Sequence, residues 1–149
     1  MLRPAALLSL VLIVLPGAGV GQPGRAPAQI DVVANDYAFM PLPAHVPAGA
    51  TVFTFVNRGK VAHELSIAAL KPGVSVDSVL AKVKVGGRPR ELLDRSVGIL
   101  VAGPGSEPDG KLLTDLRKGV SYLLFCNFRD TPEAPFHLML GMFTVLRVD

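Results

Sequence analysis

Short runs of β-branched and aromatic residues recur along the chain from residue 30 to the C-terminus, and apolar and polar positions alternate in several of them. Such runs, separated by turn residues, are typical of β-strands. Residues 47–49 (PAG) and 118–119 (KG) supply turns of this kind. We expect strands over residues 30–33, 51–56, 63–67, 122–127 and 143–148.

One segment has a different period. Val76, Val79, Leu80 and Val83 fall at positions i, i+3, i+4 and i+7, which places them on one face of an α-helix. Ser75 is a good N-cap, so we expect a short helix over residues 75–84 that serves packing. The Pro and Gly residues that follow, as far as residue 111, predict a loop. Many short strands around a single helix indicate a β-sandwich or barrel.

The first residues have the pattern of a secretory signal peptide. Arg3 precedes an apolar stretch over residues 5–15, which Pro16 and several small residues follow. We expect cleavage near Gly21 and Gln22, which makes the protein periplasmic or extracellular and limits membrane contact to the signal peptide. An uncleaved anchor is the alternative, although the stretch is short for a bilayer span. We therefore divide the chain into a signal peptide (1–21), a flexible lead-in (22–29) and one domain (30–149).

Composition excludes several functions. The chain has 149 residues, of which 50% are hydrophobic, so one domain with its own core is expected. The formal net charge is only +3, there is no tryptophan, and no block of like charges occurs. These features argue against nucleic-acid binding. No Ser/His/Asp or paired-carboxylate arrangement stands out, so we do not expect an enzyme. We also expect the protein to be a monomer.

The single cysteine, Cys126, is informative in an exported protein. Cysteines in oxidising compartments normally pair, and this one has no internal partner. It is therefore an intermolecular bridge, a reactive thiol or a metal thiolate.

The neighbours of Cys126 favour a metal. Cys126 ends one expected strand, His137 lies in the next loop, and Met142 begins the following strand. His63 lies far upstream, at the start of another strand. A soft thiolate, two imidazoles and a weak thioether form the ligand set of electron-transfer copper sites. We predict one copper ion, bound by His63, Cys126, His137 and Met142.

At these positions the chain resembles the cupredoxins, the type 1 blue copper proteins. Residues 57–63 (NRGKVAH) are similar to the family's Asn-x-Gly segment before its first histidine, and residues 122–126 (YLLFC) to the strand that ends at the thiolate. Residues 46–49 (VPAG) and the spacing of His137 and Met142 also match. The resemblance implies an all-β, Greek-key sandwich with one short helix in an insertion. It also implies a single type 1 copper and a one-electron carrier.

Three features depart from the family pattern. The loop between Cys126 and His137 is longer than in plastocyanin-like members. Glu64 stands where plastocyanin and azurin have an asparagine that hydrogen-bonds across the site. Met139 also lies in the loop and is a second candidate for the axial position. Glu64 or Glu133 could instead supply an oxygen ligand and make the site red rather than blue.

Two other functions stay open, namely a copper-trafficking or copper-holding protein and a metal-free binding module. For the electron carrier, we expect a redox partner protein to dock near the His137 loop. The apolar loop residues Pro135, Phe136, Leu138 and Leu140 would then surround an exposed edge of the histidine.

Overall fold

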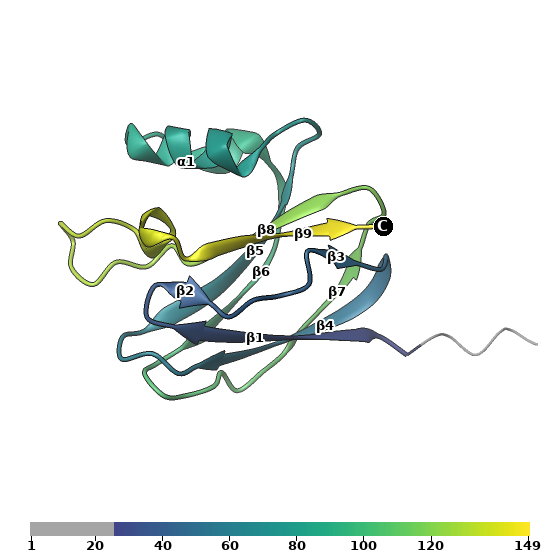
Figure 1. Cartoon of the computed structure of the whole chain (residues 1–149), viewed down its shortest axis with the longest axis horizontal. Helices are drawn as coiled ribbons and strands as arrows, with labels where there is room; N and C mark the ends of the chain where they lie inside the picture. Colours follow the sequence, from purple (N-terminus) through teal and green to yellow (C-terminus); the bar gives the residue numbers. More distant parts are fainter. Residues whose placement is uncertain (1–25) are drawn as a thin grey trace, which may run out of the picture.

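The computed structural model describes residues 26–149, which form two facing β-sheets and one α-helix (Figure 1). The expected signal peptide lies outside the described residues. The strands are β1 (Ala28–Asn35), β2 (Ala38–Phe39), β3 (His45–Val46), β4 (Gly49–Asn57), β5 (His63–Leu70), β6 (Leu93–Ala102), β7 (Leu112–Leu116), β8 (Ser121–Phe125) and β9 (Phe143–Val148). One sheet has the order β2-β1-β4-β7 and the other β3-β9-β8-β5-β6. Most neighbours are antiparallel, but β1 pairs with β4, and β3 with β9, in parallel.

The core lies between the two sheets. Every second side chain of β1 and β4 points inward, so that Phe53 and Phe55 are buried against Leu65 and Ile67 of the opposite sheet. Tyr122 is fully buried as well, and its hydroxyl accepts the backbone N–H of Arg117. Each large apolar side chain buried in this way contributes about 1.5–3 kcal/mol.

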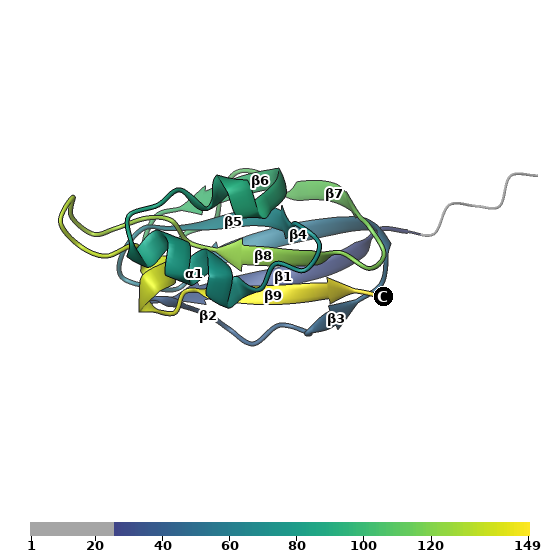
Figure 2. The same cartoon turned by 90° about the horizontal axis from the view of Figure 1, so that it is seen from above.

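The helix α1 (Val76–Lys84) lies over part of the outer face of the second sheet, as Figure 2 shows. Ser75 caps it by accepting the N–H of Ser78, as the sequence predicted. Val79 is buried against Leu70 and Leu123 in a second apolar cluster. β5 is buried along its whole length: it lies between β8 and β6 in the sheet, and its last residue, Leu70, packs in the cluster with Val79. The predicted packing role of the helix is confirmed.

The five predicted strands are all present, with ends that differ by a few residues. β1 already begins at Ala28, within the expected lead-in. The prediction of a loop up to residue 111 was wrong, because β6 is a ten-residue edge strand there. Its exposed and half-buried residues follow no simple alternation, since only one neighbour and part of one face cover it. β7 was not among the predicted strands either.

Gly98 shows why the two missed strands fit together. A Cβ atom at this position would lie 2.5 Å from the Leu112 Cδ1 atom, which is far inside van der Waals contact. The missing side chain therefore lets β6 and β7 approach each other at the side of the sandwich.

Among the described residues, no helix has the length and apolar character needed to cross a bilayer.

Candidate metal centre

Strand order brings the predicted ligands to one end of the second sheet. His63 begins β5, Cys126 directly follows β8, and Met142 directly precedes β9. β8 runs antiparallel to both β5 and β9, and Phe125 lies opposite both Ser66 and Phe143. The start of β5, the end of β8 and the start of β9 therefore meet. His137 begins the short 3₁₀ helix η2 (His137–Leu140), which lies between Cys126 and β9.

Three of the four predicted ligands form one cluster. The sulfur of Cys126 lies 3.4 Å from Nδ1 of His137 and 3.8 Å from Nδ1 of His63. The two Nδ1 atoms are 3.1 Å apart. All three side chains are buried. A point equidistant from three atoms so spaced lies about 2 Å from each, close to the ~2.0–2.3 Å at which imidazole and thiolate bind Zn²⁺. The cluster therefore has the donors and the size for one transition-metal ion.

Burial favours the neutral thiol of Cys126 while no metal is bound. It raises the pKa of the thiol above its ordinary value of 9.0. The backbone N–H groups of Glu64 and Phe128 donate to the sulfur and act in the opposite direction. The thiolate is the form that ligates metals, so a bound cation would take the place of this proton.

His63 has one nitrogen turned to the cluster and one without a partner. Burial, reinforced by nearby His137, lowers the pKa of His63 below its ordinary value of 6.5. Its Nε2 has no hydrogen-bond partner within residues 26–149, although a carboxylate oxygen of Asp36 is 3.9 Å away. Metal ligation needs the neutral imidazole. The environment of His63 therefore suits a ligand that binds through Nδ1.

Asn57 fixes the segment that leads to His63. Its side-chain amide donates to the carbonyl oxygens of Val61, Ala102 and Gly103 at 2.8–3.1 Å. Its Oδ1 accepts the N–H of Gly59 at 2.8 Å. The Asn-x-Gly segment of the sequence is therefore a hydrogen-bonded turn that holds the start of β5 against the end of β6.

Glu64 and Glu133 lie outside the cluster of ligand atoms. The carboxylate of Glu64 accepts the N–H of Asn127 at 3.0 Å and the hydroxyl of Ser66 at 2.9 Å. Glu64 thus connects β5 to the residue after Cys126, in the place where the resembled family has an asparagine. Glu133 is exposed on the loop. Neither carboxylate is grouped with the His and Cys donors.

Met142 is buried in the core between the sheets, together with Leu146 and Val148 of β9. This arrangement agrees with the alternation of the strand. Met142 is also joined to two predicted ligands through the backbone, since its N–H donates to the carbonyl of His137 and its carbonyl accepts the N–H of Cys126. Met139 is half-buried in η2 and lies outside that core.

The expected exposed edge of His137 is absent, because only 1% of this residue is accessible. Its Nε2 lies 3.1 Å from Oδ1 of Asp130, and the ring of Tyr37 packs edge-on against it at 5.0 Å between centroids. Leu138 is buried too, whereas Leu140 is exposed. The prediction of an exposed edge failed because Tyr37 lies in the distant turn between β1 and β2, and nothing in the sequence pattern connects that turn with the site.

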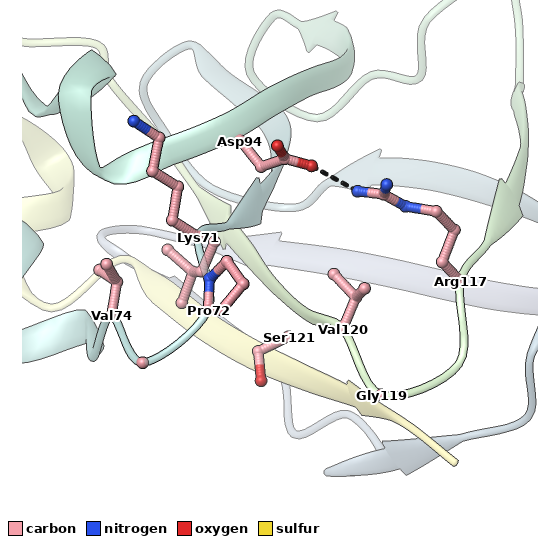
Figure 3. Close-up of a pocket in the computed structure, with 10 residues that line it drawn as sticks. Lys71, Pro72, Val74, Asp94, Arg117, Gly119, Val120 and Ser121 are labelled. Carbon is pink, nitrogen blue, oxygen red and sulfur yellow. Dashed lines mark hydrogen bonds and ion pairs between the residues drawn. The ribbon is translucent and has the colours of Figure 1, made fainter.

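A surface cavity of about 340 Å³ lies at the far end of β5 from His63 (Figure 3). Lys71, Val74 and Ser121 are among its lining residues, and an ion pair joins Asp94 to Arg117 beside them. It contains none of the predicted ligands. The candidate site is thus the buried cluster and not this cavity.

No protein-family model and no curated protein matches this sequence. Solved structures do match. Dithionite-reduced auracyanin from Roseiflexus castenholzii is 20% identical, with a TM-score of 0.56 over 83% of this chain and 98% of its own. An azurin, Az-iso2 from Methylomonas sp. strain J, is 17% identical, with a TM-score of 0.54 over 83% and 99%. Auracyanin A from Chloroflexus aurantiacus is 16% identical, with a TM-score of 0.52 over 83% and 99%. The fold is therefore that of the cupredoxins.

Proposed function

We propose that this protein is an exported one-electron carrier with a single type 1 copper ion, bound by His63, Cys126, His137 and Met142. The observation that carries the proposal is the buried triangle formed by one sulfur and two Nδ1 atoms. One thiolate with two imidazoles and a distant thioether is the donor set of electron-transfer copper sites. Auracyanin A, which shares the fold, is described as a "blue" copper protein.

The residues of the chain would keep the site in one shape. Copper supplies the change between two oxidation states, and a site that hardly changes shape between them transfers electrons with little reorganisation. Asn57 holds the segment before His63, and Glu64 holds the residue after Cys126. Met142 is fixed by backbone hydrogen bonds to the neighbouring ligand residues. These contacts supply the rigidity that an electron carrier needs.

The burial of the ligands favours a carrier over a copper-holding protein. His63, Cys126 and His137 are at most 1% exposed. A protein that passes copper to a partner needs ligands that a second protein can reach and replace. Here the exchange would require the site to open first.

A redox partner would dock on the loop around η2. Leu140 is 47% exposed there, and the Arg129 guanidinium lies 3.8 Å from the centroid of the Phe136 ring.

We keep the expectation of a monomer outside the cytoplasm. Mass spectrometry of the exported fraction should find a chain that begins near Gln22, and a membrane-bound chain that retains Met1 would contradict export in soluble form.

Copper titration with redox cycling tests the proposed function. The purified protein should bind one copper ion and become intensely coloured. Ascorbate should bleach the colour and ferricyanide should restore it, without loss of copper. Release of copper on each reduction would favour the copper-holding alternative, and absence of copper binding would favour a metal-free module.

A further inference from the structure

A series of hydrogen bonds connects Tyr37, Asp130 and His137. The Tyr37 hydroxyl donates to Oδ2 of Asp130 at 2.5 Å, and Oδ1 of the same carboxylate lies 3.1 Å from Nε2 of His137. A carboxylate has only acceptor atoms, so Nε2 carries the imidazole proton. In the neutral imidazole the other nitrogen, Nδ1, then has no proton, and it is the one that faces Cys126 and His63.

The residues of this hydrogen-bonded series come from two distant parts of the sequence. Asp130 comes from the loop between Cys126 and His137, whereas Tyr37 belongs to the two-residue turn between β1 and β2. Tyr37 has a φ of 59°, in the left-handed region that non-glycine residues seldom adopt. Such a conformation persists only where the surrounding structure enforces it. Its hydroxyl bond to Asp130 and its ring contact with His137 supply that enforcement.

His63 lacks this arrangement. Its Nε2 lies 3.9 Å from Asp36 and makes no hydrogen bond within the described residues. The two imidazoles of the cluster are therefore not equivalent, because a carboxylate orients only His137.

We propose that Asp130 is a positioning residue for His137. Asp130, which Tyr37 holds in place, fixes the imidazole of His137 with Nδ1 turned toward the proposed metal site. This inference rests on the proposed function for the identity of the ion, but the tautomer itself exists without one. Carboxylates that accept from a ligating histidine fix its orientation and make it a stronger donor. The hydrogen bond from the Tyr37 hydroxyl holds the Asp130 carboxylate in this position.

Nuclear magnetic resonance of ¹⁵N-labelled, metal-free protein tests the tautomer directly. His137 should be protonated at Nε2 in the wild-type protein and in Asp130→Asn, because the amide oxygen of Asn can still accept a hydrogen bond from the Nε2–H group. In Asp130→Ala the two tautomers should become mixed. An unchanged Nε2–H tautomer in Asp130→Ala would overturn the proposal. This readout does not depend on copper, so it separates failure of this inference from failure of the proposed function.

Copper affinity and reduction potential supply the second test. Asp130→Ala should weaken copper binding by about 10–100-fold, the usual cost of removing such a partner. Tyr37→Phe should cause a smaller loss, and Asp130→Asn should restore much of the affinity. Both Asp130 variants should raise the potential, because removal of a negative charge favours the reduced site. The control is Glu133→Gln, an exposed carboxyl of the same loop. An equal effect of Glu133→Gln would show a general charge effect and overturn the positioning role.

Discussion

The backbone N–H of Glu64 points at the sulfur of Cys126 across 3.4 Å. Glu64 directly follows His63 in the sequence, so one ligand segment donates a hydrogen bond to the other ligand. The side chain of Glu64 adds a second connection, to the N–H of Asn127. The start of β5 and the residues that follow β8 are therefore joined at the site itself.

Replacing Glu64 with Ala should weaken this connection. The N–H of Asn127 would lose a charged acceptor, and hydrogen bonds to charged groups contribute about 1.5–3 kcal/mol. We expect the free energy of unfolding to fall by about 2 kcal/mol in urea titrations, while copper binding persists. Glu133→Ala is the matched control and should change neither quantity. Loss of copper binding in Glu64→Ala at full stability would instead make Glu64 a ligand.

Replacing Asn57 with Ala should destabilise the site end of the sandwich more strongly. It leaves the N–H of Gly59 and three carbonyl groups without their partner, and each buried group left unpaired costs about 1–3 kcal/mol. We expect a loss of at least about 2 kcal/mol in chemical denaturation. Asn35→Ala removes an exposed amide and should have little effect. A similar loss in both variants would contradict the role given to Asn57.

The metal-free protein should be most stable within a limited range of pH. The lowered pKa of His63 means that the unfolded state takes up protons first, so stability should fall as the pH drops below about 6.5. The raised pKa of Cys126 means that the unfolded state loses its proton first, so stability should also fall above about pH 9. Thermal unfolding across this range measures both limbs, with Cys126→Ser as control. In that variant the loss of stability at alkaline pH should become smaller, and the loss at acidic pH should remain.

Met142 and Met139 can be distinguished by their reduction potentials. Met142→Leu should keep copper, because the three other ligands carry most of the affinity, and should raise the potential, because loss of a donor disfavours the oxidised ion more. Met139→Leu should change little. Voltammetry of both variants checks this. A shift in Met139→Leu alone would transfer the axial role to Met139, and no shift in either would favour an oxygen ligand.

The sequence predicts those parts of the molecule that depend on local pattern. Ser75 and Val79 give the helix its cap and its buried face, and the order of His63, Cys126 and His137 gives the cluster. The sequence does not reveal β6, because an edge strand with an irregular burial pattern lacks a clear period. Nor does it reveal the Tyr37 and Asp130 contacts, because these depend on how a turn of one sheet meets a loop of the other.

The central claim is that Cys126 supplies a thiolate to copper, and the visible absorption spectrum of Cys126→Ser tests it most directly. The copper-loaded wild-type protein should have an intense charge-transfer band, which requires the thiolate. The folded Cys126→Ser protein, loaded with the same amount of copper, should lack this band. An unchanged band in Cys126→Ser would contradict the assignment of the site.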